Sequence, residues 1–328
     1  MAVDGSEGTG PAPLVYAIVL NWNGGDAVPA CLRSLAASTY PTLHVVVVDN
    51  GSTDGSVKKI AGLLASMGGT LLCNERNLGF TGGVAVGIQE ARRRDAHYVF
   101  LLNDDATVDL ACIATLVSAL EARPDAGLAG PRIVWADRQD TLWSAGMSVS
   151  WTSATVHAHR DELANAVGAI DPAARRIVQG LSGCALLVDR AVIDAVGPLD
   201  PRYFAYYEDI DWCLRARAAG WRSLYVGDAV AQHAGSASAN RGAAGSQSAF
   251  VNYYGARNAL LFMGTHAPHR LRPVTLGRLL LDLGTALARV VAGGVALRRP
   301  GAVARARAIV EGVADWRAGR FGPRSGAL

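Results

Sequence analysis

Residues 98–109 read YVFLLNDDATVD, and this stretch decides how the rest of the chain is interpreted. The apolar run 98–102 is typical of a buried strand, and it stops at Asn103, Asp104 and Asp105 before a helical pattern begins. The acids therefore lie at the carboxyl end of a strand, the edge where open α/β sheets bind ligands. Adjacent carboxylates repel each other unless a cation or protons compensate, and their oxygens suit Mg²⁺ or Mn²⁺. A polar turn that only caps the next helix is the alternative.

The composition indicates an ordinary soluble protein of one large or two smaller domains, with 328 residues, 50% apolar and 18% charged. Charge is segregated, because eleven arginines and three acids from Arg270 onward give +8 and leave −5 for the remainder. Five widely spaced cysteines without a CxxC pair are typical of reduced core residues in a cytoplasmic protein. No basic segment followed by an apolar one opens the sequence, so we expect no secretory signal and interpret residues 1–13 as a disordered leader.

Strands and helices alternate through residues 14–125, which predicts a nucleotide-binding α/β half. The pattern predicts strands at 16–20, 43–48, 70–73 and 98–102, and helices over 26–37, over 57–65 and up to about residue 94. Each strand ends in polar or glycine-rich residues. The residues at these ends that we assign to nucleotide binding are Asn21, Asn23, Asp49, Asn50, Gly79, Phe80, Gly82, Asn103 and Asp104.

Two of these strand ends carry a specific expectation. Asp49 is placed to accept hydrogen bonds from a base or a ribose, and Gly51 and Gly55 permit tight turns after it. The turn NERNLGFTGG opens a helix, where backbone N–H groups can approach a phosphate. Helix capping by Asp and Ser is the alternative, and it accounts for residues 52–56 better than for Asp49.

Residues 126–268 are interpreted as the second half of the fold. Strands are predicted within 126–151, and QGLSGCALLVDR predicts a turn followed by a strand and a short helix. Glu208 and Asp209 fall in the first turn of an amphipathic helix that carries Trp212, and a helix dipole by itself favours acids there. His233 follows another predicted strand and precedes a stretch rich in Gly, Ala and Ser.

Residues 269–328 predict a basic helical extension. The apolar segment from Leu271 is interrupted by Arg278, Asp282 and Arg289, so we predict an amphipathic helix and no transmembrane span. Two interpretations stay open: contact with an anionic membrane surface, and packing on the α/β domain with a solvated basic face. No nucleic-acid-binding module is evident.

Five motifs occur in a fixed order along the chain: IVLNWNG, VVVDNGSTDGS, NLGFTGG, FLLNDDATV and GPLDPRYFAYYEDIDWCLRARAAGW. Together they resemble the large inverting glycosyltransferase family 2, of GT-A fold, and its rhamnosyltransferase-like branch in particular. The resemblance covers residues 16–263. The sequence departs from the pattern at Asn103, where the family has an acid, and at Val84 and Ala85, where many relatives carry Asn.

The resemblance implies a donor site with a divalent cation. Asp49 would contact the nucleotide base, and residues 103–105 would occupy the metal-binding DxD position, with Asp105 as its last acid. His233 would be a further ligand of the Mg²⁺ or Mn²⁺. Arg241 would contact the donor diphosphate from the stretch after His233.

The resemblance also implies that residues 126–268 are the acceptor-binding and catalytic half. Asp209, the second residue of the ED pair, would be the catalytic base, and Glu208 would support or orient it. Ser182 and Gly183 would lie beside the acceptor, and we add Trp212 to the acceptor contacts.

These roles imply an inverting glycosyltransferase that moves a sugar from a nucleoside diphosphate to a hydroxyl of a glycan, a glycolipid or a natural product. A dTDP-rhamnose-like deoxysugar is the expected donor, with UDP-sugars next. The alternatives are a non-catalytic sugar-nucleotide-binding protein and a nucleotidyltransferase. We expect the protein in the cytoplasm, with the inner membrane face and a homodimer among the states left open.

Overall fold

A computed structural model describes residues 11–158, 174–235, 246–297 and 301–324 of the chain. The first elements are β1 (Val15–Asn21), α1 (Val28–Ala36), β2 (Leu43–Asp49), α2 (Ser56–Met67), β3 (Thr70–Cys73), α3 (Gly79–Arg93), β4 (Tyr98–Asn103), β5 (Ala106–Val108) and α4 (Cys112–Glu121). They are followed by β6 (Ala126–Trp135), β7 (Leu142–Ser144), β8 (Met147–Ser150), β9 (Thr155–Ala158), β10 (Arg175–Val178), β11 (Ala185–Asp189), α5 (Arg190–Val196), α6 (Glu208–Ala218) and β12 (Arg222–His233). Three helices complete the described chain: α7 (Ser246–His266), α8 (Arg272–Leu297) and α9 (Ala302–Arg317).

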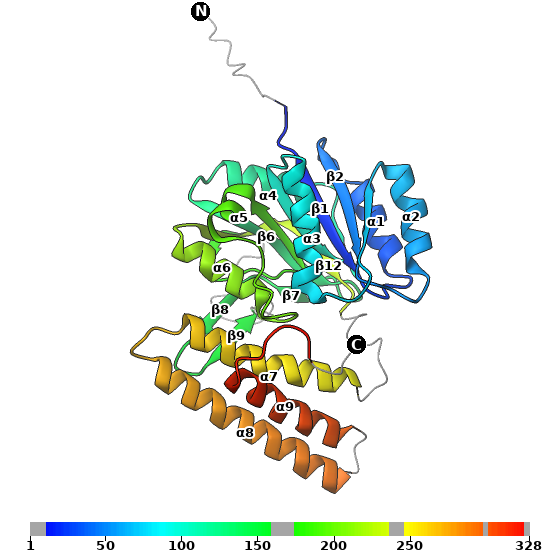
Figure 1. Ribbon diagram of the computed structural model, residues 1–328. Coiled ribbons are helices and arrows are strands. Elements are labelled where there is room, and N and C mark those ends of the chain that lie inside the picture. Colours follow the sequence, from blue (N-terminus) through cyan, green and yellow to red (C-terminus); the bar gives the residue numbers. More distant parts are fainter. Residues whose placement is uncertain (1–10, 159–173, 236–245, 298–300, 325–328) are drawn as a thin grey trace, which may run out of the picture.

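One mixed sheet forms the centre of the molecule, in the strand order β10-β12-β6-β11-β4-β1-β2-β3, with β5 on β12 and β7 on β6 (Figure 1). β1 pairs in parallel with both β2 and β4, so that Asn21 lies opposite Asp49 and Leu20 lies opposite Asn103. The polar ends of these three strands therefore meet at one edge of the sheet. β11 runs antiparallel to β4, with Ala185 opposite Leu102, and brings a segment of the second half of the chain to that edge.

Helices cover both faces of the sheet, which explains why strands such as β2 and β4 are apolar throughout. Along β1, Val15 and Val19 pack on the side of α1, α2 and α4, while Tyr16 and Ile18 pack on the side of α3, α5 and α6. This alternation follows from the two-residue period of a strand. The result is a three-layer sandwich, which agrees with the α/β fold class predicted from the sequence.

The C-terminal helices form a further layer beside one end of the sandwich (Figure 1). α7 packs against α8 and α9, and the hairpin of β8 and β9 lies between this layer and the sheet. A separate apolar cluster joins Met147 and Val149 of the hairpin to Ile210 of α6 and to Phe262 and Leu279 of the helical layer. Within the described residues, no helix is both long enough and apolar enough to cross a membrane.

Two differences from the sequence-based elements lie in the first half of the chain. Residues 106–108 form the short strand β5, which pairs with the end of β12, whereas no strand was predicted there. Three residues are too few for an alternating pattern to be visible, so only the partner strand defines this element. The first helix begins at Val28 rather than near residue 26, because residues 24–27 form a turn. All five cysteines are free and four of them are buried; Cys73 is exposed.

Candidate active site

Asp49 organises the first part of the polar edge. Its Oδ1 accepts a hydrogen bond from Asn21 Nδ2 at 2.6 Å, and its Oδ2 accepts from the backbone N–H groups of Gly51 and Ser52 at 3.1 and 3.0 Å. Asn21 is fully buried, and its Nδ2 also lies 3.0 Å from the hydroxyl oxygens of Ser52 and Ser56. Asn21 thus acts by fixing the loop after β2, and Asp49 lies at the centre of that loop.

Asn50 connects this loop to the glycine-rich turn before α3. Its Nδ2 donates to Gly79 O at 2.9 Å and to Asn77 Oδ1 at 3.1 Å, while its Oδ1 accepts from Asn74 Nδ2 at 3.0 Å. The Asn50 side chain is buried and occupied by these contacts. Gly79 has a φ of 76°, a backbone conformation that favours glycine. Asn50 therefore shapes the predicted phosphate-binding turn.

The turn after β1 approaches the acids after β4. Asn23 adopts a φ of 52°, and its side-chain Oδ1 accepts from Thr53 N at 2.8 Å, which ties the first loop to the second. A Cβ atom placed on Gly24 would lie 2.8 Å from Asp104 Oδ2 and 2.3 Å from Asn21 Oδ1. Only glycine fits there, so the Asp104 carboxylate lies directly against this turn.

Asp105 and His233, the two predicted metal ligands, lie together. His233 Nε2 is 3.1 Å from Asp105 Oδ1, and both side chains are almost completely buried. The pairing of β12 with β5 sets His233 opposite Ala106, and Ala234 N donates to Asp105 O at 3.0 Å. The imidazole packs on the ring of Trp143 at a centroid distance of 4.6 Å, and its Nδ1 is buried with no hydrogen-bond partner.

These two residues suit a cation that is also bound by substrate. Among the described residues, no group of three or more His, Cys, Asp or Glu side chains is arranged to hold a metal ion by itself. Mg²⁺ is commonly held by one or two carboxylates, with waters and substrate phosphates completing its shell. The buried carboxylate of Asp105 and the imidazole nitrogen Nε2 of His233, which face each other at 3.1 Å, fit that donor set. Arg241, the predicted diphosphate contact, lies outside the described residues.

Asp209 lies on the first turn of α6 and faces the segment before β11. Its Oδ2 accepts a hydrogen bond from Gly183 N at 3.0 Å, and its Oδ1 accepts from Ile210 N at 2.8 Å. A Cβ atom on Gly183 would lie 3.4 Å from Asp209 Cβ and 3.6 Å from Phe80 Cε1, so the three residues converge. Burial raises the pKa of Asp209, and the hydrogen bonds from Gly183 and Ile210 oppose part of this increase.

Glu208 is buried beside Asp209, and its Oε2 has no hydrogen-bond partner. Burial, followed by the negative charge of Asp209, raises the pKa of Glu208 well above the ordinary value. Two carboxyl groups in sequence thus differ in environment, since Asp209 receives two backbone N–H bonds. Asp209 is the member of the pair whose ionised form the backbone stabilises.

The two acidic centres share one buried neighbour, Cys184. After burial, the negative charge of Asp105 contributes most to the raised pKa of this thiol, and the charge of Asp209 contributes as well. Cys184 O accepts from Asn103 N at 2.9 Å, and Ser182 Oγ accepts from Cys184 N at 3.2 Å. The join between β4 and β11 therefore brings the residues after β4 and the predicted acceptor segment to one site.

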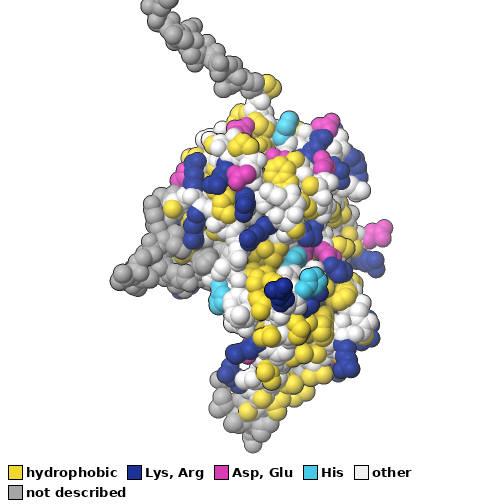
Figure 2. Space-filling view, turned by 90° about the vertical axis from the view of Figure 1, so that its left-hand side faces the viewer, with side chains coloured by type: hydrophobic (Ala, Val, Ile, Leu, Met, Phe, Trp, Pro, Cys, Tyr) yellow, Lys and Arg dark blue, Asp and Glu magenta, His cyan; other side chains and the backbone are white. Residues whose placement is uncertain are grey.

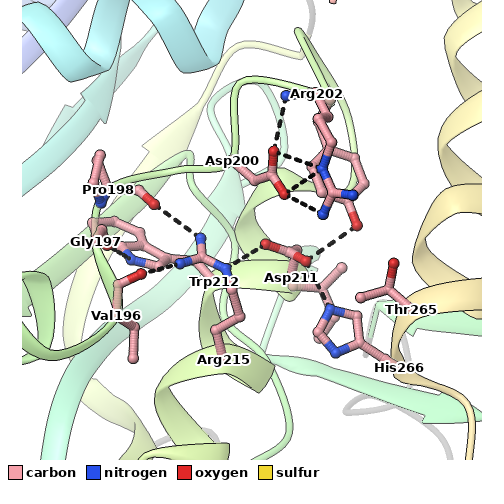
Figure 3. A network of polar contacts seen from close by, with 12 residues as sticks. Val196, Gly197, Pro198, Asp200, Arg202, Asp211, Trp212, Arg215, Thr265 and His266 are labelled. Atoms are coloured by element: carbon pink, nitrogen blue, oxygen red, sulfur yellow. Dashed lines mark hydrogen bonds and ion pairs between the residues drawn. The ribbon is translucent and has the colours of Figure 1, made fainter. Parts of the chain in front are cut away.

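One residue assigned from the sequence does not face this site. Trp212 is fully buried, and its indole N–H donates to Gly197 O at 2.9 Å, so it packs in the core and is not an acceptor contact (Figure 3). Asp209 and Trp212 are three residues apart on α6, a spacing that makes side chains neighbours on a helix, but the side chain of Trp212 packs into the core. Gly82 lies in the first turn of α3, where a Cβ atom would come within 2.8 Å of Leu78 Cβ, and its role in donor binding stays a prediction.

A buried polar network behind the site includes residues that the sequence did not reveal. Asp211 accepts hydrogen bonds from Tyr203 Oη at 3.1 Å and Arg215 Nε at 2.8 Å, and it pairs with His266 Nε2 at 2.7 Å (Figure 3). Burial alone would raise the pKa of Asp211, but the hydrogen bonds from His266 and Arg215 outweigh it, and the pKa is lowered. Only Arg215, one helical turn away, could be anticipated from spacing.

The family described as "Glycosyltransferase like family 2" matches residues 11–249, which include every strand end at this site. The chain belongs to this glycosyltransferase family. Of the activities considered from the sequence, glycosyl transfer is the one that this membership supports, and the protein is a glycosyltransferase.

Relatives of the glycosyltransferase include the N-acetylglucosaminyl-diphospho-decaprenol L-rhamnosyltransferase of Mycobacterium tuberculosis, which is 30% identical over 243 residues. That match covers 66% of this chain and 74% of the relative. The galactofuranosyltransferase GlfT1 of the same species is 36% identical over 110 residues, covering 33% of this chain and 36% of its own. The resemblance to the rhamnosyltransferase-like branch is thereby confirmed.

Solved structures show the same fold at low identity. A mannosyltransferase from Pyrobaculum calidifontis, in complex with GDP-Man and Mn²⁺, superposes with a TM-score of 0.54 at 17% identity, covering 93% of this chain and 87% of that one. GalNAc-T7 with UDP, GalNAc and Mn²⁺ gives a TM-score of 0.56 at 14% identity, covering 81% of this chain and 55% of that one. The expected GT-A fold is confirmed.

Proposed function

We propose that this glycosyltransferase transfers a sugar from a nucleoside-diphosphate donor with inversion of the anomeric centre. The first candidate donor is a dTDP-linked deoxysugar, dTDP-L-rhamnose, and UDP-sugars come next. The observation that carries the proposal is the pair of hydrogen bonds that hold the Asp209 carboxylate against Gly183, at the sheet edge that also carries Asp105. The relative that acts as an L-rhamnosyltransferase supports the choice of sugar.

Asp209 would act as the general base. Its raised pKa makes the carboxylate a better proton acceptor than an exposed aspartate, while the N–H groups of Gly183 and Ile210 keep its ionised form accessible. It would take the proton of the acceptor hydroxyl as the oxygen attacks the anomeric carbon and the nucleoside diphosphate leaves. A single displacement of this kind inverts the configuration. Glu208, whose pKa is also raised, would support or orient Asp209.

A divalent cation, Mg²⁺ or Mn²⁺, is proposed at Asp105 and His233. When bound, it would neutralise the charge that develops on the leaving diphosphate. The protein's own part on this side is to present the buried carboxylate and imidazole, and to hold the backbone of the loops after β1, β2 and β3 through Asn21, Asp49 and Asn50. Asp49 is proposed as the contact to the nucleotide base.

The proposed acceptor is a hydroxyl of a sugar linked through diphosphate to a polyprenol. The support comes from the M. tuberculosis relative, whose name specifies an N-acetylglucosaminyl-diphospho-decaprenol acceptor. Ser182 and Gly183 remain the proposed acceptor contacts, because they precede β11 at the side of the site where Asp209 lies.

The direct test is release of dTDP from dTDP-L-rhamnose when a short-chain prenyl-diphosphate-linked N-acetylglucosamine is added, with Mg²⁺, Mn²⁺ or EDTA. We expect turnover that EDTA abolishes and a product with inverted anomeric configuration by NMR. Thermal-shift measurements with dTDP- and UDP-sugars identify the donor independently, because a ligand that binds only the folded state raises the melting temperature. Donor binding without turnover would favour the non-catalytic alternative, and retained configuration would contradict the mechanism.

We further propose that the enzyme works at the cytoplasmic face of a membrane and contacts it through α8. Val274, Leu281 and Val291 on this helix are 60%, 70% and 49% exposed, and the exposed cations Arg278 and Arg289 lie on the same helix. Figure 2 shows apolar side chains running across the lower, helical part of one face with cationic side chains around them. Such a surface is suited to anionic lipid headgroups, where a lipid-linked acceptor would be found.

The membrane contact is tested by flotation with vesicles of phosphatidylglycerol and phosphatidylcholine. We expect wild type to float with anionic vesicles, and Leu281→Glu to float several-fold less. Leu110→Glu is the matched control, since Leu110 is 57% exposed but lies outside the C-terminal helices. Equal flotation of both variants would contradict this membrane surface.

A further inference from the structure

The loop of residues 202–207 has an unusual backbone. Phe204, Tyr206 and Tyr207 have φ angles of 65°, 70° and 74°, although none of them is glycine. Bulky residues rarely adopt such angles, and they keep them only where surrounding contacts determine the conformation. Tyr207 directly precedes α6, so this loop decides where the helix begins and how Asp209 is presented.

Asn258 of α7 holds this loop by donating hydrogen bonds to the backbone carbonyl groups of the loop. The side chain is fully buried, and Nδ2 donates to Tyr203 O at 2.9 Å, Ala205 O at 2.7 Å and Tyr206 O at 2.9 Å. One amide nitrogen has two hydrogens, so the three oxygens share them. Three carbonyls of one short loop can point at a single atom only when the chain curls around it. The positive φ angles produce this curl.

Arg257 extends the same attachment. Its Nη2 donates to Arg202 O and Tyr203 O at 2.9 Å each, its Nη1 donates to Gly322 O at 2.6 Å, and its Nε donates to Asn258 Oδ1 at 3.0 Å. Gly322 N in turn donates to Arg202 O at 3.0 Å, so the segment after α9 joins the arrangement. The fully buried guanidinium also lies over three aromatic rings, those of Tyr253, Tyr254 and Phe321.

The other side of the loop touches the predicted donor turn. Thr81 N donates to Phe204 O at 3.3 Å, and a Cβ atom on Gly79 would lie 2.5 Å from the ring of Phe204. The ring stacks on Tyr254 of α7 at a centroid distance of 5.2 Å. The loop is thus enclosed between α7 and the start of α3, and its position sets the distance between the donor turn and α6.

We propose that Arg257 and Asn258 are positioning residues for glycosyl transfer, which hold the loop of residues 202–207 so that α6 presents the Asp209 carboxylate to Gly183. The proposal rests on the proposed role of Asp209 as the base. Apolar side chains of similar volume often provide equal or greater stability than a buried charge. Arg257 and Asn258 instead donate five hydrogen bonds to backbone carbonyls of one loop, and such bonds determine the backbone conformation of that loop.

The test uses the full chain with Asn258→Asp, Arg257→Lys and the control Thr265→Ala. Asn258→Asp keeps the volume but removes the donor, and Arg257→Lys keeps the charge but removes the planar fork. Thr265 lies on α7 and donates only within its own helix, to Leu261 O at 2.8 Å. Binding of dTDP-L-rhamnose by calorimetry counts the folded sites, and kcat for transfer to the prenyl-diphosphate-linked N-acetylglucosamine is expressed per donor-binding site.

For Asn258→Asp and Arg257→Lys we expect kcat per site to fall at least about tenfold, because small misplacements of reacting groups cost up to about 10² in rate. The donor Kd and the acceptor KM should stay within about twofold, and Thr265→Ala should match wild type. Activity that falls only in proportion to the donor-binding sites would show a purely structural role and overturn the proposal.

Two further arms keep the result decisive. If Asn258→Asp does not fold, Arg257→Lys decides alone, and an unchanged kcat per site there overturns the proposal. Asp209→Asn is measured in parallel. If Asp209→Asn loses turnover while Arg257→Lys keeps it, the positioning role fails and the proposed function stands; if Asp209→Asn retains turnover, the proposed base itself is wrong.

Discussion

Asp49 on the donor side and Asp209 on the proposed catalytic side are held in different ways. On the donor side, Asp49 is fixed by Asn21, Gly51 and Ser52, which belong to consecutive loops of one βαβ unit. On the proposed catalytic side, the chain around Asp209 is held by groups from the C-terminal layer, among them His266. The hydrogen bonds of Asp49 are thus made within one βαβ unit, whereas the chain around Asp209 depends on helices that follow it in sequence.

The largest effect is expected for Asp209→Asn, which tests whether catalysis and donor binding are separate. We expect Asp209→Asn to lower kcat by about 10² to 10⁴, the usual contribution of a general base, and to leave donor affinity unchanged because the donor loops do not depend on it. Steady-state kinetics and calorimetry measure the two quantities. Since the pKa of Asp209 is raised, wild-type activity should fall as the pH decreases through that value. A parallel loss of donor binding would contradict the separation of the two sides.

Asp211→Asn removes the charge at the centre of the buried network beside α6. Its carboxyl is fully buried between Arg215 and His266, and removing one partner of such an ion pair costs about 3 to 5 kcal/mol of the free energy of unfolding. Because the pKa of Asp211 is lowered, this stability is present above the ordinary value and is lost as the pH falls through the folded-state value. Urea denaturation at pH 7 measures the loss.

The control for that experiment is Asp228→Asn. Asp228 pairs with Arg175 at 2.6 Å, but both side chains are about 40% exposed, so the pair is worth only about 0 to 1 kcal/mol. Equal destabilisation by the two variants would show that burial of the network around Asp211 does not matter.

Two glycines test the contact between the donor turn and the loop of residues 202–207. Gly79 and Gly55 have nearly equal φ angles of 76° and 79°. A Cβ atom at Gly55 would meet nothing within 4 Å, whereas at Gly79 it would meet the ring and the carbonyl of Phe204. We expect Gly55→Ala to cost about 1 kcal/mol from the backbone alone and Gly79→Ala to cost about 1 to 3 kcal/mol more. Thermal unfolding of both variants measures the difference, and equal values would mean that the loop of residues 202–207 yields freely.

The smallest effect concerns Glu208. Its folded-state pKa is raised, so the stability associated with its protonated form is complete below the ordinary value and is lost as the pH rises through the folded-state value. Glu208→Gln removes this loss, and we expect the variant to be more stable than wild type at pH 8 by about 1 kcal/mol, or roughly 2–4 °C. At pH 4 the two should agree. A difference that does not change with pH would assign the effect to packing.

The strand ends of the donor side could be predicted because they depend on local pattern. A run such as Tyr98–Leu102 followed by acids determines both the strand and the edge that the acids occupy. The proximity of Asp105 and His233 came only with the family resemblance, because the pairing of β5 with β12 joins residues far apart in sequence.

The catalytic side was predictable only in part. The acids of α6 were visible in the sequence, but Trp212 was placed at the site although it packs in the core. The attachment of loop 202–207 to Asn258 and Gly322 could not be predicted, since backbone carbonyls leave no mark in the residue pattern.

The hydrogen bond between Arg202 and Gly322 has a consequence for the order in which parts of the protein fold during synthesis. A ribosome synthesises the chain from its amino end, and domains begin to fold during synthesis. The side chains of Asn21, Asp49 and Asn50 make their hydrogen bonds to residues up to Gly79, whereas the loop before α6 waits for α7 and then for Gly322. A nascent chain can therefore order the loops after β1 and β2 long before Asp209, the proposed base, is set in place.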